Sequence, residues 1–298
     1  MKIIVPTTNV NLISSNVAEP KSPEVLWNAA TAYSIGDEVI RTTTHKKYKR
    51  IIAGTTATAP ENDTVNWLDI GSNARWSMFD DVVGTVTTNS LSIDVSIQTE
   101  GVSGIYLAGL SGRTLDIELL ENLGGAVVYS KTIDLDGTII TSFYDWFFNP
   151  FELLEDVVVS DLPYHFTSSV LNVSISGTSN VSCGVMKYGV VYDIGMTQYG
   201  ATSSIVDYSK KEVDDFGNYY ILERAYAKKA NFEIFTYKQD YNKISKVLQQ
   251  VRAKPAVYIG TEIQGYEPLV VYGFYKDFSI NVSYPTMHNC SLEVEGLT

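Results

Sequence analysis

Segments of alternating apolar and polar residues between positions 85 and 195 constrain the fold of this chain more than any other sequence feature. Apolar side chains occupy every second position in 91–97, a series that begins at Leu91, and again in 115–119 and 171–175. A period of two is typical of strands that bury one face. With no helical period between them, these segments predict an antiparallel β-sandwich of jelly-roll-like type. A further apolar set at Val128, Ile133 and Leu135 extends it, and Asp136-Gly137 and Ser176-Gly177 are expected to form tight turns.

The last third of the chain combines strands with one amphipathic helix. Ile244, Val247, Leu248 and Val251 follow the spacing i, i+3, i+4, i+7, and Pro255 is expected to end the helix. Strands are predicted at 232–237, 256–259, 269–274, 278–284 and 290–295. These patterns predict a C-terminal α+β unit in which a single helix covers a sheet.

Two further segments complete a mainly β, multi-domain chain of 298 residues. Residues 1–25 contain three prolines and few large apolar side chains, so we expect an extended N-terminal arm that becomes ordered by docking on something else. Residues 26–72 are rich in aromatic residues and turn formers, which indicates a small β module. The predicted domains are therefore 1–25, 26–72, 73–195 and 196–298.

The small module offers four rings, Trp27, Tyr33, Tyr48 and Trp67, for which two roles are open. Aromatic faces can stack on sugars or on a partner protein. A module of this size also has few other side chains with which to build a core, so most of the rings are expected inside it. Trp67 follows a polar loop and is the ring that we expect on the surface.

Negative charge is concentrated in the middle of the chain. The net charge is +1 for residues 1–75, −12 for 76–200 and −1 for 201–298. An acidic surface repels phosphate backbones, which disfavours nucleic acid as a partner. No apolar run approaches the roughly 20 residues of a membrane span. The opening segment is interrupted at Pro6, so a signal peptide is not expected either.

No pattern indicates catalysis, a cofactor or a metal site. His45, His165 and His288 lie far apart, and Cys183 and Cys290 are expected to be buried free thiols. The Asp134-Leu-Asp136-Gly137 segment lacks the later ligands of a calcium loop. Carboxylate pairs at 80/81, 152/155 and 214/215 could serve the cleavage of glycosidic bonds, but 34 acidic residues make chance neighbours common. We therefore expect a protein that is not an enzyme.

Two resemblances point to attachment. Trp27, Tyr33, Gly36-Asp37, Tyr48 and Trp67 resemble the pattern of chitin- and cellulose-binding modules, although Asn66 and Leu68, not a second large aromatic, flank Trp67. Tailed-bacteriophage virion proteins are similar in the segments 67–71, Asn73, 75–80, 193–195, 198–200, 205–209, 215–217 and Arg224.

The second resemblance implies a structural component of a phage tail or baseplate, present in several copies, that mediates subunit attachment and anchors or carries a fibre. Its partners would be other tail or baseplate subunits, and it would be assembled in the host cytoplasm into the virion. Because 11 of the 20 tyrosines lie between 201 and 298, and Tyr is favoured at interfaces, this part is expected to contact neighbours. The alternative is a lectin-like adhesion protein of the virion that binds a host-surface glycan.

Overall fold

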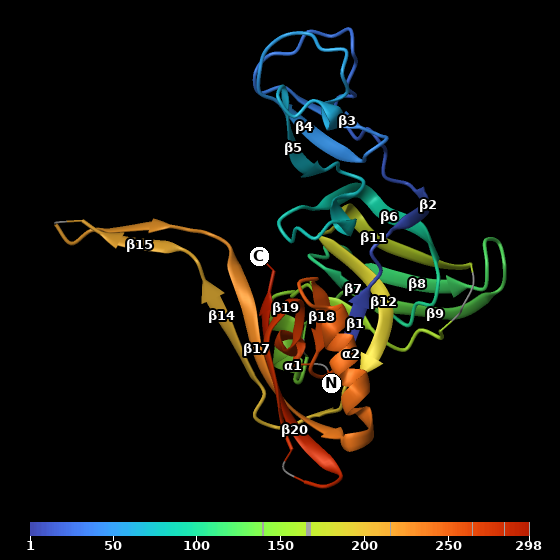
Figure 1. Ribbon diagram of the computed structural model, residues 1–298, viewed down its shortest axis with the longest axis vertical. Coiled ribbons are helices and arrows are strands. Elements are labelled where there is room, and N and C mark those ends of the chain that lie inside the picture. The colour runs from blue at the N-terminus through green and yellow to red at the C-terminus, as the bar shows by residue number, and fades with distance from the viewer. Residues whose placement is uncertain (139, 165–167, 215, 264, 283, 298) are drawn as a thin grey trace.

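The computed structural model describes residues 1–138, 140–164, 168–214, 216–263, 265–282 and 284–297, and it confirms a mainly β fold built from antiparallel sheets (Figure 1). The largest sheet has ten strands in the order β10 (Val157–Val159), β7 (Gly104–Ala108), β12 (Val185–Asp193), β1 (Lys2–Pro6), β18 (Ala256–Ile259), β19 (Val270–Asn281), β20 (Met287–Gly296), β17 (Tyr226–Tyr237) and β13 (Met196–Thr197), with β14 (Thr202–Asp207) also paired to β17. A five-stranded sheet has the order β2 (Asn11–Ser15), β6 (Thr87–Thr99), β11 (Ser169–Cys183), β8 (Thr114–Leu120) and β9 (Val127–Asp134).

Across the described ranges, two smaller sheets and two α-helices complete the fold. The small module contains β3 (Glu38–Arg41), β4 (Lys46–Arg50) and β5 (Trp67–Ser72), and a separate ribbon contains β15 (Lys210–Val213) and β16 (Tyr219–Leu222). The α-helices are α1 (Phe143–Phe148) and α2 (Tyr241–Gln250), and single 3₁₀ turns occur at Pro60–Asn62, Ser77–Phe79, Lys238–Asp240 and Glu267–Leu269.

The predicted sandwich is formed by the five-stranded sheet and one end of the ten-stranded sheet. Ile93 of β6 and Leu171 of β11 share a buried core with Ile105 and Leu107 of β7. These residues are fully buried, as the period of two predicts for the inner face of a strand. The sandwich prediction is therefore confirmed in its layers and in its main strands.

Three local predictions inside the sandwich are wrong. Leu91 has a φ of 66°, which takes it out of the alternation, and it is exposed. Asp136-Gly137 does not form a hairpin turn, because Asp136 bridges Leu153 and the Gly137 amide donates to the carbonyl of Glu152. Ser176-Gly177 lies inside β11, where the register with β6 shifts between Ser176 and Asn180.

The helix of the C-terminal unit is confirmed, and it covers one face of the ten-stranded sheet. Ile244, Val247 and Leu248 of α2 are buried in one cluster with Phe232 of β17 and Tyr258 of β18. The segments 269–274 and 278–284, which we expected to be separate, belong largely to one strand, β19, with an irregular pairing between Tyr275 and Asp277.

The prediction that residues 1–25 form an arm that docks on another molecule is wrong for both of its strands. β1 pairs with β12 on one side and with β18 on the other, so it lies in the interior of the ten-stranded sheet. Ile3 enters the cluster under α2, and Ile4 enters the cluster on the opposite face. β2 pairs with β6 in the sandwich. The chain thus docks its N-terminal segment on itself, and β1 joins the sandwich strands to the C-terminal strands in one continuous sheet.

Candidate functional site

The four aromatic residues of the small module meet in one cluster rather than at its surface. Tyr33, Tyr48 and Trp67 are buried together with Val39, and Trp27 packs partly buried against them. The expectation that most of the rings build the core is confirmed, and the expectation that Trp67 lies on the surface is wrong, because its exposed fraction is 2%. The ring of Tyr33 meets Trp67 edge-on at a centroid distance of 5.1 Å.

Cationic side chains cover part of the ring surface that remains. The guanidinium of Arg50 lies 4.8 Å from the centroid of the Trp67 ring, and that of Arg41 lies 4.9 Å from the Trp27 ring. Cation–π contacts of this kind are worth up to about 2 kcal/mol when they are desolvated. The rings thus contact the module itself, and the structure presents no stacked set of open aromatic faces at these four positions.

The carboxylate of Glu19 connects the small module to the sandwich. Its Oε1 atom lies 2.8 Å from Nδ1 of His45 and accepts from Asn73, and its Oε2 atom lies 3.4 Å from Nη1 of Arg75. The imidazole of His45 also stacks on the Trp76 ring at a centroid distance of 4.1 Å. His45 therefore has a structural role at this junction.

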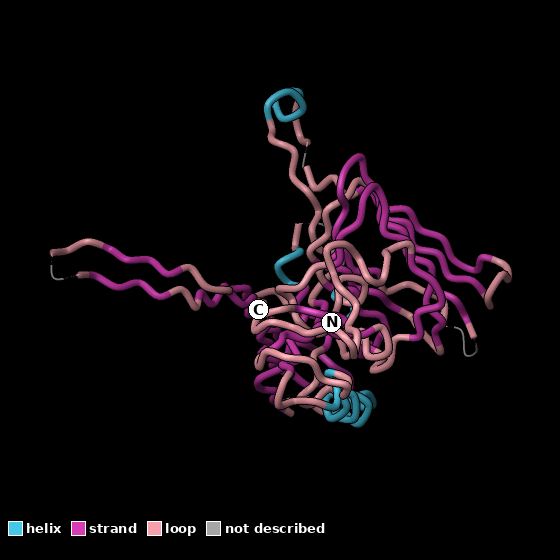
Figure 2. Tube along the Cα trace, turned by 90° about the horizontal axis from the view of Figure 1, so that it is seen from above, coloured by secondary structure: helices cyan, strands magenta, loops and turns pink. Residues whose placement is uncertain are grey.

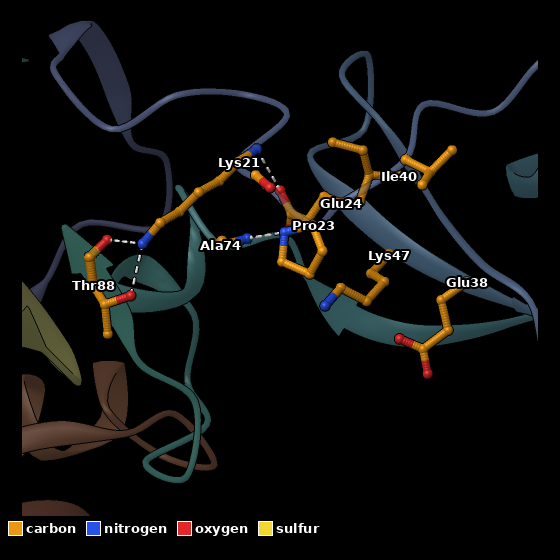
Figure 3. A pocket seen from close by; sticks show the side chains of 10 residues that line it. Lys21, Pro23, Glu24, Glu38, Ile40, Lys47, Ala74 and Thr88 are labelled. Atoms are coloured by element: carbon orange, nitrogen blue, oxygen red, sulfur yellow. Dashed lines mark hydrogen bonds between the residues drawn. The ribbon is translucent and has the colours of Figure 1, made fainter. Parts of the chain in front are cut away.

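A small cavity of about 260 Å³ lies beside the same junction (Figure 3). Lys21 Nζ donates to the hydroxyl of Thr88 at 2.6 Å, and Glu24 accepts from the backbone amides of Lys21 and Ala74 at 3.0 and 2.8 Å. Burial lowers the pKa of Lys21, an effect that Glu24 partly opposes. Since these polar groups satisfy one another, the cavity is best explained as a seam between the module and the body.

Of the carboxylates proposed as pairs from the sequence, Asp80 and Asp81 have separate partners, whereas Glu152 and Glu155 line a groove and form no ion pair within the described residues. Asp81 accepts from Lys187 at 2.8 Å and from the Tyr272 hydroxyl at 2.9 Å. Burial pushes the pKa of Asp81 up, but the hydrogen bond and charge of Lys187 outweigh it and hold the pKa below its ordinary value. Asp80 instead accepts from the Thr85 hydroxyl.

The remaining sequence candidates are also accounted for. Asp214 accepts from the backbone amides of Phe216 and Asn218 in a turn, and Asp215 and His165 lie outside the described residues. His288 is buried in β20 opposite Thr236. Burial raises the pKa of Cys183 to about 12, and burial followed by the charge of Glu233 raises that of Cys290 to about 11. In the described part of the chain, no group of three His, Cys, Asp or Glu side chains is arranged to hold a metal ion. Nor is any described helix both long and apolar enough to cross a membrane.

An exposed aromatic helix at the end of a stem is the first surface that the sequence analysis missed. The helix α1 stands away from the body, on one side of the molecule (Figure 2). Six large aromatic side chains on and beside it are between 65% and 89% exposed. They are Phe143, Tyr144, Trp146, Phe147, Phe148 and Phe151. Full burial of one such side chain contributes about 1.5–3 kcal/mol, so this aromatic stalk (residues 135–138 and 140–154) leaves much favourable burial unused.

Local hydrogen bonds hold the aromatic stalk in place. At its base Leu154 N donates to Leu135 O, and at its end Ser142 caps α1 by accepting from the Asp145 amide at 3.2 Å. The Asp145 carboxylate in turn accepts from Thr141, an interaction that lowers the pKa of Asp145. Capping is important here because a helix of six residues is too short to be stable alone. The sequence feature that could have indicated the aromatic stalk is the set of five aromatic residues in 143–148, which follows a Ser-x-x-Asp capping pattern at Ser142.

A second missed surface is the long β-ribbon that continues from β14 and β17. Beyond the pairing of Tyr208 N with Ala225 O, β15 and β16 pair, among the described strands, only with each other, and they project far from the body (Figures 1 and 2). Tyr219 and Ile221 alternate with Tyr220 and Leu222, so both faces of the ribbon carry large apolar side chains, and all four are at least 57% exposed. Phe216, near the tip, is 90% exposed.

Comparisons with known proteins do not identify the chain. A scan against protein-family models found no match, and neither did searches of the curated proteins and of the solved structures. The functional argument therefore rests on the two projecting surfaces and on the charges around them.

Proposed function

We propose that this chain is a structural subunit of a multi-copy assembly, and specifically of a bacteriophage tail or baseplate, where it attaches to neighbouring subunits and anchors a fibre. The observation that carries the proposal is the β15–β16 ribbon. An isolated two-stranded hairpin is marginally stable in water, and this one exposes apolar side chains on both faces. A partner that covers the ribbon removes this cost. The segments that resemble tail proteins supply the type of assembly.

The β15–β16 ribbon can bind a neighbouring chain through its open strand edges as well as through its side chains. Its two strands pair with each other, and in the described part of the chain neither pairs with a third strand. Open strand edges offer backbone donors and acceptors to a neighbouring chain. Exposed Tyr and Phe side chains are enriched in the central parts of protein interfaces. The ribbon therefore supports a role in reaching an adjacent subunit.

A shortened ribbon tests the proposal. Residues 209–224 are replaced by Asn-Gly, because Tyr208 and Ala225 are already paired and a two-residue turn can join them. We expect the variant to fold and to be absent from tail particles purified from the organism or phage that carries the sequence, whereas the wild-type chain is found in them by mass spectrometry. Tyr220→Ser with Leu222→Ser, compared with Tyr219→Ser with Ile221→Ser, identifies the face that docks. Particles that lack the wild-type chain would contradict the proposal.

The second candidate function, binding of a host-surface glycan, is favoured by one observation on a different surface. The four module rings pack internally, but the rings of the aromatic stalk are open, and Trp146 is 68% exposed. An open indole face can stack on a pyranose. Glycan-array binding that disappears in Trp146→Ala and persists in the shortened-ribbon variant would support this function.

A further inference from the structure

A groove at the base of the aromatic stalk is unusually acidic. It has a volume of about 590 Å³, which falls within the range of roughly 300–1,000 Å³ typical of ligand sites. Seven of its lining residues are Asp or Glu, and none is Lys or Arg. Lys228 pairs with Asp156 and Lys2 pairs with Glu262, each from outside the lining. The other five carboxylates form no ion pair within the described residues: Asp134, Asp136, Glu152, Glu155 and Glu267.

A tyrosine hydroxyl in the same groove is also without a hydrogen-bond partner among the described residues. Tyr106 lines the groove and is 3% exposed, and no hydrogen bond within the described residues involves its hydroxyl. Burial raises the pKa of Tyr106 well above its ordinary value, and the nearby Asp156 raises it further, so the hydroxyl keeps its proton and can donate. The hydroxyl therefore offers, independently of the carboxylates, a donor to a group that enters the groove.

The opposite charge is found on the helix α2 and the turns beside it. Residues 238–254 contain five Lys or Arg residues against one Asp, in a chain with a net charge of −12. The five cations are exposed, and none forms an ion pair with a described residue: Lys238, Lys243, Lys246, Arg252 and Lys254. The apolar face of α2 is buried in the core, so the helix must present its basic face outwards.

These two charged surfaces lie on opposite sides of the molecule. In Figure 2 the aromatic stalk rises on one side of the body and α2 lies on the other, so one chain cannot bring its own helix to its own groove. Two different surfaces that are complementary between copies give a head-to-tail contact, which closes into a ring or extends into a filament.

We propose that the groove at the base of the stalk binds the basic face of α2 from a second copy of this chain. Lys243 and Lys246 of one copy pair with Glu152 and Glu155 of the next, and the Tyr106 hydroxyl donates to a polar group that enters with the helix. The aromatic stalk rises beside the groove and packs along the docked copy. This contact rests on the proposed assembly function and assigns two of the surfaces that it uses.

Reciprocal charge reversal tests the contact with the full-length chain. Variant A carries Lys243→Glu and Lys246→Glu, and variant B carries Glu152→Lys and Glu155→Lys. Each alone places like charges opposite one another, so we expect self-association to weaken by more than about tenfold in either. An equimolar mixture of A and B restores both kinds of pair and is expected to associate as the wild type does. The control, Glu100→Lys with Glu121→Lys, reverses two exposed carboxylates elsewhere on the sandwich and is expected to leave association unchanged.

Mass photometry and sedimentation velocity measure the association at about 50 mM and about 500 mM salt, where screening should weaken the wild-type contact. Circular dichroism verifies that each variant is folded. A zero-length amine–carboxyl crosslink between isotopically labelled and unlabelled copies should join α2 to residues 152–156. The proposal is overturned if the wild type stays monomeric at about 100 µM. It is also overturned if A and B associate normally, or if their mixture does not. If the charge-reversal experiment overturns this contact, the shortened ribbon still tests the proposed assembly function separately.

Discussion

Replacing Trp67 with Ala should unfold the small module while the rest of the chain stays folded. The side chain is 2% exposed, meets Tyr33 edge-on, and lies under the guanidinium of Arg50. Truncating a buried Trp to Ala costs about 3–5 kcal/mol, and the lost ring pair adds about 0.5–1.5 kcal/mol. A unit of this size has a stability of only about 2–7 kcal/mol. The loss is therefore comparable to the whole stability of the three-stranded sheet.

Hydrogen exchange measured by mass spectrometry follows this unfolding strand by strand. In Trp67→Ala we expect the amides of β3, β4 and β5 to exchange rapidly, while those of β6 and β11 keep their wild-type protection. Trypsin should cut first after Lys46, Lys47 or Lys49 of β4. Trp27→Ala is the matched control, because its half-buried ring lies outside the central pair and should cost about 1 kcal/mol. Wild-type protection of β3–β5 in Trp67→Ala would refute the assignment of this ring to the core.

Three further predictions concern charge, thiols and helix capping. Asp81→Asn should destabilise the fold by about 1–2 kcal/mol in urea melts at neutral pH, because Lys187 is buried while the Asp81 side chain is 67% exposed and partly screened. Because the pKa of Asp81 is lowered in the folded state, its contribution to the free energy of unfolding is present above a pH of about 4 and is lost as the pH falls further. The free energy of unfolding of the variant should therefore fall less steeply at acidic pH than that of the wild type. Equal pH dependence of the two proteins would contradict this pairing. Cys183 and Cys290 should react with a thiol reagent at pH of about 8 only after unfolding, since burial raises the pKa of each, and rapid reaction of the native protein would show that the burial is wrong. Ser142→Ala should cost about 1 kcal/mol locally, seen as faster exchange of the α1 amides with an unchanged global melt, and unchanged exchange would show that the cap is not used.

The elements predicted correctly are those whose burial repeats along the sequence. The period of two around Ile93 and Leu171, and the helical spacing from Ile244 to Val251, each report a local face turned to a core. The position of β1 could not be predicted in this way. Its partners in β12 and β18 lie nearly 200 residues or more away, and a run of Ile3, Ile4 and Val5 does not encode which strands will flank it.

Two dipeptides that are typical of turns, Asp136-Gly137 and Ser176-Gly177, have other roles in the fold. A Cβ at Gly177 would lie 2.8 Å from Val181 Cγ1, so glycine is required by close packing within an irregular strand. A Cβ at Gly137 would lie 3.4 Å from the Glu152 carbonyl oxygen, an ordinary contact distance, so packing does not require glycine there, and the Gly137 amide instead pairs across the stalk base. In both places contacts that a local pattern does not contain replace the expected turn.

The aromatic stalk shows why the candidate surfaces were harder to find than the core. Hydrophobic periodicity identifies the buried side of a helix or strand. It applies only when the apolar residues of that element pack against a core. In α1 five of the six residues, Phe143, Tyr144, Trp146, Phe147 and Phe148, carry exposed rings, and Asp145 is the single polar position. The fold then places this helix at the end of a stem, where the chain itself cannot bury it. A helix that exposes this much apolar surface is stable in water only at a cost, and contact with another molecule removes that cost. For this reason the stalk belongs with the ribbon among the surfaces through which the chain is proposed to bind its neighbours.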